Sequence, residues 1–187
     1  MLIHKGTQTL ETSRLTLRRV RRSDATSMFR NWASDPEVTK FLTWSPYENE
    51  ESVYPILEQW TQEYIKPEFY LWMIVLKEID EPVGTISVVR HRDEIAQAEI
   101  GYCLGRNWWH TGIMSEALAA VIRFLFTDVG MNRIEAKHDF NNPHSGGVMK
   151  KCGMRYEGTK RASDRNNQGI IDTVHYAILK SDYEAAV

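Results

Sequence analysis

Three strand-like segments follow one another between residues 69 and 105, and no helix-like segment separates them. They are FYLWMIVLKE (69–78), EPVGTISVVRH (81–91) and IAQAEIGYCLG (95–105), with the turn IDEP between the first two. Strands joined by so short a turn run antiparallel, because a parallel connection needs a crossover of a dozen or more residues. The chain also has no G-x-G-x-x-G between a strand and a helix, so we do not expect a doubly wound parallel sheet.

The rest of the chain supplies helices around this block of strands. Leu15, Leu17 and Val20 alternate with basic residues, which predicts a strand with a solvated face. The other periodic segments predict helices at 23–32 (ending before Pro36), 50–65, 113–130 and 142–152, and strands at 132–140, 154–163 and 170–180. This β-α-α-β-β-β-α-β-α-β-β order predicts a mixed α/β sheet covered by helices, in one domain over residues 1–187.

Composition argues against several classes of function. The 187 residues carry a formal net charge of −2, so the chain lacks the excess of positive charge that is typical of nucleic-acid-binding proteins. The N-terminus lacks an apolar signal segment, and no apolar run has the length of a membrane span. We therefore expect a cytoplasmic protein without a membrane partner.

Cysteine and histidine spacing predicts neither a disulfide nor a metal centre. Cys103 and Cys152 form no C-x-x-C pair, so free thiols in a reducing compartment are expected. His138 and His144 lie six residues apart with no further ligand beside them. The sequence accordingly predicts no metal site.

The segment NWWHTGIMSEALAAVIRFLF (107–126) places a lone glycine at the start of a long amphipathic helix. First-turn amides of a helix have no intrahelical partner and lie at the positive end of its dipole, so they favour anions. Gly112 has no Cβ, which lets a ligand oxygen approach the backbone. A simple turn is the alternative, since no Gly-Lys-Ser/Thr ends the segment.

These residues resemble a known family. AEIGYCLGRNWWHTGIMSEAL (98–118) is similar to the acetyl-CoA segment of the GNAT superfamily of N-acetyltransferases, in its RimJ/RimL-type (ribosomal-protein-alanine N-acetyltransferase-like) branch. The superfamily pattern Q/R-x-x-G-x-G/A appears as WHTGIM (109–114), which keeps the middle glycine and carries end residues usual in that branch. ETSRLTLRRVRRSDA, NPHSGGVMKKCGMRYEGTKR and DTVHYAILKSDY resemble its opening strand and helix, its N-x-x-S helix with the next strand, and its closing strand.

The resemblance implies a fold and a co-substrate. The fold would be the GNAT fold, classed α/β (α+β), with a mixed six- to seven-stranded sheet, about four helices, and a splay between the fourth and fifth strands after Leu104. The pantetheine arm of acetyl-CoA would lie along that strand end, and its pyrophosphate on the amides from His110 to Ser115. The implied cofactor-binding residues are Tyr102, Cys103, Leu104, Trp109, His110, Thr111, Gly112, Ile113, Met114, Ser115, Asn142, Ser145 and Lys151.

The resemblance also implies direct attack of a primary amine on the thioester, assisted by a general base. Glu99 is the candidate base, because it lies on the strand that leads to the loop and shares a face with Gly101 and Cys103. A surface carboxylate without a catalytic role is the alternative. A cysteine nucleophile at Cys103 or Cys152 is disfavoured, because no histidine is near either in sequence.

The proton donor is less well specified by the sequence. Many GNAT enzymes carry a tyrosine seven residues after the asparagine that opens the helix, and this chain has Met149 there. Ser145, three residues after Asn142, takes its place as the catalytic candidate in the resembling branch. The alternative is that Ser145 only caps the helix start.

Two segments are expected on the acceptor side, DPEVTKFLTWSPYENEES (35–52) and DRNNQG (164–169). Their acids suit a cationic amine, although the acids at 48–51 equally suit the first turn of a helix. The resemblance implies the N-terminal amine of a ribosomal protein as acceptor. Small amines such as polyamines or aminoglycosides, a non-catalytic CoA-binding module, and a homodimer all stay open.

Overall fold

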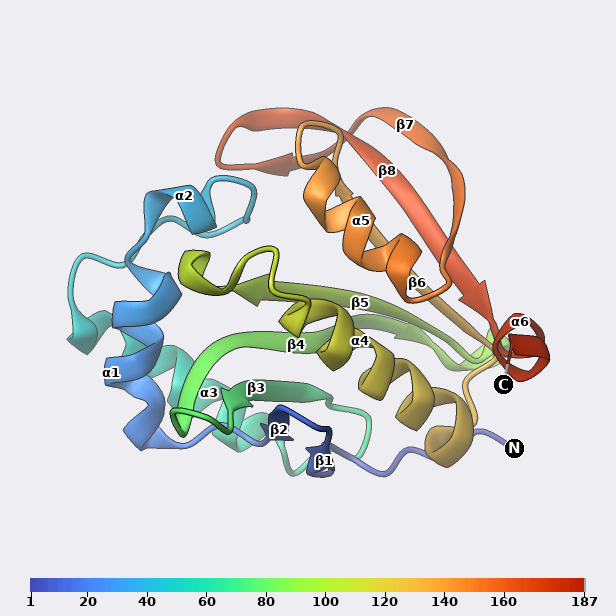
Figure 1. Ribbon diagram of the computed structural model, residues 1–187, viewed down its shortest axis with the longest axis horizontal. Helices are drawn as coiled ribbons and strands as arrows, with labels where there is room; N and C mark the ends of the chain where they lie inside the picture. The colour runs from blue at the N-terminus through green and yellow to red at the C-terminus, as the bar shows by residue number, and fades with distance from the viewer. Residues whose placement is uncertain (187) are drawn as a thin grey trace.

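The chain folds around one twisted, eight-stranded sheet, which a computed structural model describes together with its helices for residues 1–186 (Figure 1). The strand order is β1-β2-β3-β4-β5-β6-β8-β7, and every neighbouring pair is antiparallel except β5 and β6. The strands are β1 (Leu10–Glu11), β2 (Leu15–Arg18), β3 (Leu71–Leu76), β4 (Glu81–Arg92), β5 (Gln97–Leu104), β6 (Arg133–Asp139), β7 (Arg155–Asn166) and β8 (Gly169–Leu179).

The three consecutive strands form the antiparallel block β3–β4–β5, as their short connections predicted. The sheet has one strand more than the sequence indicated, because β1 is a two-residue strand with no periodic pattern of its own. The predicted mixed sheet is confirmed, and β5–β6 is its one parallel pair among the described residues.

Helices cover both faces of the sheet. On one face lie α4 (Ile113–Phe124), extended by a π-helical turn at Leu125–Val129, and α5 (Pro143–Lys151). On the other face, α1 (Ala25–Met28) with a π-helical turn at Phe29–Ala33 and α3 (Tyr54–Glu63) cover the half of the sheet built from β2 to β4. Because β3 is covered on both sides, all six of its residues are buried.

Two short helices were not predicted from the sequence. The first helical region ends at Ala33, before Pro36, as expected. Pro36 then begins a separate helix, α2 (Pro36–Thr39), where the Asp35 side chain accepts a hydrogen bond from Glu37 N at 2.9 Å. Proline is well tolerated at the first helical position, where its missing N–H has no partner to lose. The helix α6 (Lys180–Ala186) follows β8 directly. No helix within residues 1–186 has the length and apolarity needed to cross a membrane.

The sheet divides in two where β5 and β6 part. Their pairing covers Gln97–Ile100 on β5 and ends at Ile100 and Ala136. Beyond that point β5 stays paired with β4 as far as Leu104, whereas β6 stays paired with β8 as far as Asp139. The expected splay is therefore present, but it begins after Ile100 rather than after Leu104. Figure 1 shows the two strands diverging, with α4 and α5 over the near face.

Candidate active site

The loop between β5 and α4 turns sharply before the helix begins. Its backbone passes through a 3₁₀ turn at Arg106–Trp108, and then His110 and Gly112 adopt φ values of 63° and 82°. The left-handed region at Gly112 is one that glycine enters without a Cβ penalty. Gly112 is the N-cap residue of α4, and its carbonyl accepts the first intrahelical hydrogen bond from Glu116 N at 3.0 Å. The amides of the three residues between them point out of the helix start, where an anion could accept from them.

Two basic side chains from distant parts of the chain lie beside this helix start. The Arg14 Nη2 atom lies 3.5 Å, and the Lys151 Nζ atom 4.0 Å, from the point where a Cβ on Gly112 would be. Arg14 Nη1 also donates to the Thr111 carbonyl at 3.1 Å. Arginine and lysine side chains at a helix N-terminus add positive charge to that of the dipole, so this corner favours a polyanionic group such as a diphosphate.

Sequence reasoning missed Arg14 as a residue of this site, and it could not distinguish Lys151 from the adjacent Lys150. Arg14 was assigned with its basic neighbours to the solvated face of a strand, and no local spacing links it to Gly112 across almost a hundred residues. Lys150, adjacent to Lys151, lies instead with its Nζ atom 5.9 Å from the centroid of the Tyr176 ring. The structure therefore separates two lysines that look equivalent in the sequence.

Glu116, in the first turn of α4, holds Arg14 in place. Its carboxylate accepts from Arg14 Nε at 2.7 Å and from Arg14 N at 3.0 Å, and also from the hydroxyls of Thr12 and Ser13. Burial acts to raise the pKa of Glu116, but these hydrogen bonds outweigh burial and lower the pKa to about 2. The turn before β2 is thereby attached to the start of α4.

Glu116→Gln is expected to lower the free energy of unfolding by about 1–2 kcal/mol at neutral pH, because it removes this hydrogen-bonded carboxylate. The pKa of Glu116 is about 2 when folded, against 4.5 for an unperturbed glutamate. Its contribution is thus complete above the unfolded value and is lost as the pH falls through the folded value. Urea unfolding of variant and wild type should show a difference that shrinks as the pH is lowered below about 5. A difference that stays constant over this range would contradict the assignment.

The gap between β5 and β6 is bridged by a tyrosine and a serine. Tyr102 Oη lies 3.0 Å from Ser145 Oγ and 3.0 Å from the Ser145 carbonyl, which accepts from it. Burial raises the pKa of Tyr102 well above its usual range, although its hydrogen bond with Ser145 opposes the shift. The tyrosine therefore keeps its proton at neutral pH, and the serine hydroxyl contacts it rather than capping α5.

Main-chain groups at the end of β5 face alternate sides. Gly105 N donates to Val83 O on β4 at 2.8 Å, and the Cys103 carbonyl is in contact with the point where a Cβ on Gly84 would lie. Successive strand residues direct their main-chain groups to opposite edges. Those of Tyr102 and Leu104 therefore face the gap. The Leu104 carbonyl already accepts from Trp109 Nε1 at 2.8 Å, which attaches the loop to the strand end.

Helix α5 begins at the far side of the gap. Asn142 occupies the N-cap position, but its side chain makes no capping hydrogen bond. Any side chain at Gly146 would collide with the buried His138 ring, because a Cβ there would lie 2.5 Å from His138 Nε2. Gly147 has no such neighbour within 4 Å. Close packing thus accounts for the first glycine, and the second leaves open space along the helix.

Glu99 lies at the point where the sheet divides. Its side chain is 9% exposed, and its carboxylate lies 3.3 Å from Lys137 Nζ and 3.7 Å from Arg90 Nε. A bulge between Val88 and Arg90 brings the arginine opposite Glu99. Lys137 is also paired with Asp164 Oδ2 at 2.8 Å. Glu99 is therefore a buried carboxylate between two cations, neither of which local sequence spacing identified.

The ion pairs keep Lys137 charged. Burial acts to lower the pKa of Lys137, but its contacts with Asp164 and Glu99 outweigh burial and raise that pKa. The hydrogen bond from Lys137 lowers the pKa of Asp164. Both partners of this pair are charged at neutral pH. Ion pairs therefore hold the side chains around Glu99 in place on this face of the sheet.

Both cysteines are free thiols. Burial raises the pKa of Cys103 to about 12 and that of Cys152 to about 11. Cys152 Sγ also donates to the Ser115 carbonyl at 3.2 Å. A thiolate is the nucleophilic form of cysteine, so thiols that stay protonated at neutral pH are poor nucleophiles, in agreement with the expectation from sequence.

The two segments expected on the acceptor side lie together. At the turn between β7 and β8, Asn167 N donates to Leu42 O at 3.0 Å, and Asn167 Nδ2 donates to the carbonyls of Thr39 at 2.9 Å and Trp44 at 2.7 Å. The Trp44 and Tyr47 rings stack at a centroid distance of 5.5 Å. The hairpin tip therefore lies against the loop after α2, as Figure 1 also shows.

One predicted acid of the first segment, Glu50, has structural partners. The Asn49 side chain accepts from Ser52 N at 3.0 Å and so caps the helical region that leads into α3. Glu50 accepts from Thr26 Oγ1 at 2.9 Å and from Tyr54 Oη at 3.1 Å. The alternative interpretation, acids in a helical first turn, accounts for these positions.

Known proteins resemble the chain in sequence and in fold. The family description "Acetyltransferase (GNAT) domain" matches residues 14–155. The chain is 34% identical over 176 residues to the uncharacterized N-acetyltransferase p20 of Bacillus licheniformis, covering 94% of this chain and 98% of that protein. It is 28% identical over 157 residues to the ribosomal protein uS5-alanine N-acetyltransferase of Escherichia coli (strain K12), covering 80% of this chain and 79% of that protein.

Solved structures of acetyltransferases also share the fold of this chain. The structure of the microcin C7 self immunity acetyltransferase MccE, in complex with acetyl-CoA and AMP, superposes with a TM-score of 0.81 at 21% identity, over 90% of this chain and 93% of that one. The match of the family description over most of the chain, the full-length relative and the shared fold agree. The protein therefore belongs to the GNAT family of acetyltransferases and is an acetyl-CoA-dependent N-acetyltransferase.

Proposed function

We propose that the protein transfers the acetyl group of acetyl-CoA to the α-amine of a protein or peptide N-terminus, with Glu99 as general base. The observation that carries the proposal is the burial of Glu99 where β5 and β6 part, between Arg90 and Lys137. A base is useful only where the reacting groups meet, and the divided sheet is the place where a cofactor on one face can reach an acceptor on the other.

The residues around the start of α4 fit the diphosphate of acetyl-CoA. The amides from His110 to Ser115 would donate to it, and Gly112 presents no Cβ in its path. Lys151, together with Arg14, would balance its charge. Trp109, Thr111, Ile113 and Met114 belong to the same loop and helix turn, and the last two would contribute through their main-chain amides, because their side chains are buried in the core.

The pantetheine arm would lie in the gap between the two half-sheets. The main-chain groups of Tyr102 and Leu104 face this gap, whereas Cys103, between them, directs its carbonyl toward β4. Asn142 lies at the far side of the gap, and its side chain makes no capping hydrogen bond. Acetyl-CoA supplies the acetyl group to be transferred, activated as a thioester.

The chain's own residues would move the protons of the reaction. Glu99 would accept a proton from the attacking amine, directly or through a water molecule. Ser145 Oγ, hydrogen-bonded to the protonated Tyr102 hydroxyl, would donate to the departing sulfur. Met149, at the position where many GNAT enzymes carry a tyrosine, is buried in the core and has no proton to donate.

An α-amine fits this site better than a lysine side chain. A free α-amine has a pKa near 8, so about a tenth is neutral at pH 7, whereas a lysine with a pKa near 10.4 needs much stronger assistance. The relative from Escherichia coli is named for acting on an alanine of a ribosomal protein, which supports the same acceptor class.

Turnover with defined acceptors tests this proposal. Peptides with free alanine or serine termini, the same peptides acetylated at the terminus but containing lysine, and a set of polyamines and aminoglycosides are offered with acetyl-CoA, and thiol release is followed. Release with the free-terminus peptides alone is the expected result. Release with the small amines alone would show that the acceptors are small amines and not peptide N-termini. Tight CoA binding by calorimetry without any thiol release would indicate a non-catalytic binding module.

Lys151→Ala is expected to raise the KM for acetyl-CoA by about five- to tenfold and to leave kcat nearly unchanged, because it removes one cation from the diphosphate site. The effect should diminish as ionic strength rises. Lys150→Ala is the matched control, since Lys150 is adjacent in sequence but lies near Tyr176. Equal effects of the two substitutions would show that only the general charge of α5 matters.

A further inference from the structure

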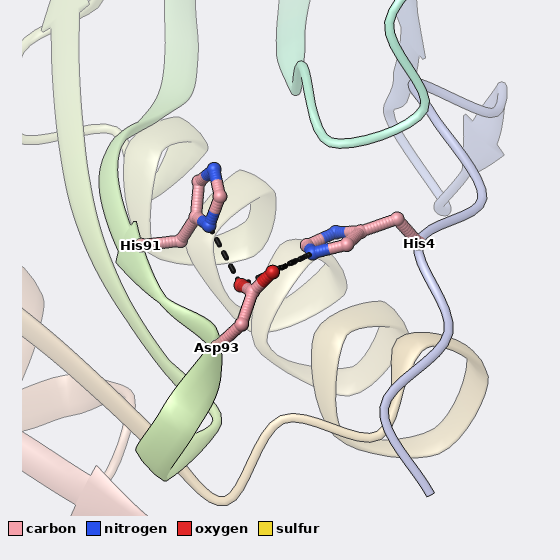
Figure 2. Close-up of side chains that lie close together, drawn as sticks. All are labelled: His4, His91 and Asp93. Carbon is pink, nitrogen blue, oxygen red and sulfur yellow. Dashed lines mark hydrogen bonds and ion pairs between the residues drawn. The ribbon is translucent and has the colours of Figure 1, made fainter.

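His4, His91 and Asp93 bring three potential metal ligands together at the end of β4. One ligand atom from each residue lies within 4.8 Å of the other two. Figure 2 shows the Asp93 carboxylate between the two imidazole rings. His91 Nδ1 lies 2.7 Å from Asp93 Oδ1, and His4 Nε2 lies 3.2 Å from both Asp93 oxygens.

The N-terminal ligand is held in place from both sides. Ile3 N donates to Val129 O at 2.9 Å, and Gly6 N donates to Pro67 O at 2.7 Å, so the backbone around His4 is attached to two other elements. The other ring nitrogen of His4, Nδ1, lies 3.0 Å from Tyr70 Oη. Tyr70 is fully buried, so the imidazole is oriented by a rigid partner.

We propose that His4 Nε2, His91 Nδ1 and an Asp93 carboxylate oxygen bind a divalent cation of the zinc type. Two imidazole nitrogens and one carboxylate oxygen are ligands that Zn²⁺ accepts, with water as a fourth ligand. Tetrahedral ligands at about 2.0–2.1 Å from the ion lie about 3.3 Å from one another. The His4–Asp93 distances already match this spacing. The His91–Asp93 distance of 2.7 Å is shorter, and the ligand atoms lie within 4.8 Å of one another, so the side chains of His91 and Asp93 must rotate to place all three ligands around one ion.

The second contact of His4 completes the arrangement. A ligating nitrogen must present its lone pair, so the ring proton of His4 then resides on Nδ1, where Tyr70 Oη accepts it. Metal-bound histidines usually donate their other N–H in this way, which fixes the tautomer and the ring orientation. Tyr70 Oη also accepts from Lys5 N at 3.2 Å, so both of its lone pairs are used.

Neighbouring cations on β4 point away from the site. Arg90 and Arg92 lie on the opposite face of the strand, where Arg90 contacts Glu99 and Arg92 donates to Gln97 Oε1 at 2.6 Å. Gln97 is the first residue of β5, whereas the cofactor loop follows Leu104 at its other end. The ion would therefore attach the N-terminal segment to the sheet on the face of β4 opposite Arg90 and Glu99, and its function would be structural.

The sequence predicted no metal site because only two of these ligands, His91 and Asp93, are close together in the chain, and two ligands alone do not indicate a site. The three ligands come from positions 4, 91 and 93, and only the pairing of the N-terminal segment with the end of β4 brings them together. Spacing-based reasoning finds sites whose ligands share one loop or helix, and this site has another origin.

Zinc titration of the full chain tests the proposal. After treatment with a chelator and its removal, wild type is expected to bind one equivalent of Zn²⁺ in competition with a chromogenic chelator, and its Tm should rise with added Zn²⁺. His91→Ala and Asp93→Asn should each weaken the binding at least about tenfold and abolish the rise in Tm. His144→Ala, which removes an exposed histidine elsewhere, is the matched control and should bind as wild type does.

Each outcome of the titration decides the matter. Absence of stoichiometric Zn²⁺ binding by wild type, or equal binding by His91→Ala and wild type, would overturn the proposal. Circular dichroism spectra confirm that the variants are folded, and the conservative Asp93→Asn keeps the shape of the site should His91→Ala fail to fold. Acetyl transfer by the metal-free variants should match that of the wild type, which separates this site from the catalytic one.

Discussion

Glu99→Gln is expected to lower kcat for acetyl transfer by about 10²- to 10³-fold while leaving the affinity for acetyl-CoA within a factor of about two. Glutamine keeps the size of the side chain and its hydrogen-bonding capacity, but it cannot accept the proton of the attacking amine. In wild type, the pH dependence of kcat/KM should reflect the catalytic base as well as the acceptor amine. In the variant, the remaining pH dependence should follow the acceptor amine alone, near pH 8 for an α-amine.

Glu135→Gln is the matched control for this substitution. Glu135 is the register partner of Glu99 across the β5–β6 pair and shares its face of the sheet, where it contacts Gln97 and Arg133. It lies outside the proposed proton path, so its loss should leave kcat nearly unchanged. A similar fall in both variants would assign the effect to the charge of the whole face, and an unchanged pH profile in Glu99→Gln would remove Glu99 as the base.

Gly112→Ala is expected to weaken acetyl-CoA binding by about 10²-fold, which corresponds to about 2.7 kcal/mol. The new Cβ would lie near Arg14 Nη2 and Lys151 Nζ, in the space where a diphosphate oxygen would approach the helix amides. The φ of 82° at this position also strains any residue with a Cβ, by about 1–2 kcal/mol. Calorimetric titration with acetyl-CoA measures the affinity, and urea unfolding measures the strain.

Gly153→Ala separates these two effects. Gly153 has nearly the same φ, 81°, but its Cβ would meet only Ile178 Cδ1, at 3.4 Å. The control should lose similar stability and keep its affinity for acetyl-CoA. If Gly112→Ala lost only stability as well, the glycine would be a simple turn residue, which is the alternative that the sequence left open.

Much of the fold follows from local patterns. The strands β3, β4 and β5 and the helix α4 were predicted because their apolar residues repeat at the periods of the sheet and the helix. Gly130 and Gly153 follow α4 with its π-helical extension and α5, and their φ values of 86° and 81° lie in the left-handed region that favours glycine at a helix end. These features depend on short-range sterics, which a single segment of sequence encodes.

Other parts of the fold depended on partners distant in the chain. The start of the splay is set by how far β6 can pair with β5 before it continues along β8, and neither strand encodes that length alone. β1 exists only because β2 lies beside it. The Leu104 carbonyl, expected to be available to the cofactor, is bound by the Trp109 indole, a contact only five residues along the chain that depends on how the loop folds.

By itself, the sequence determined the order of the strands and helices apart from β1, α2 and α6, the glycine at the start of α4 and, through the combined motifs, the acetyltransferase family. It also named Glu99 and Ser145 as candidates. Only the tertiary structure decided what surrounds them: Arg14 beside Gly112, Lys137 beside Glu99, Tyr102 against Ser145, and His4 near His91. Such contacts join residues far apart in the chain, and their electrostatic environment exists only after the sheet has assembled, whereas periodicity and backbone sterics act between neighbours.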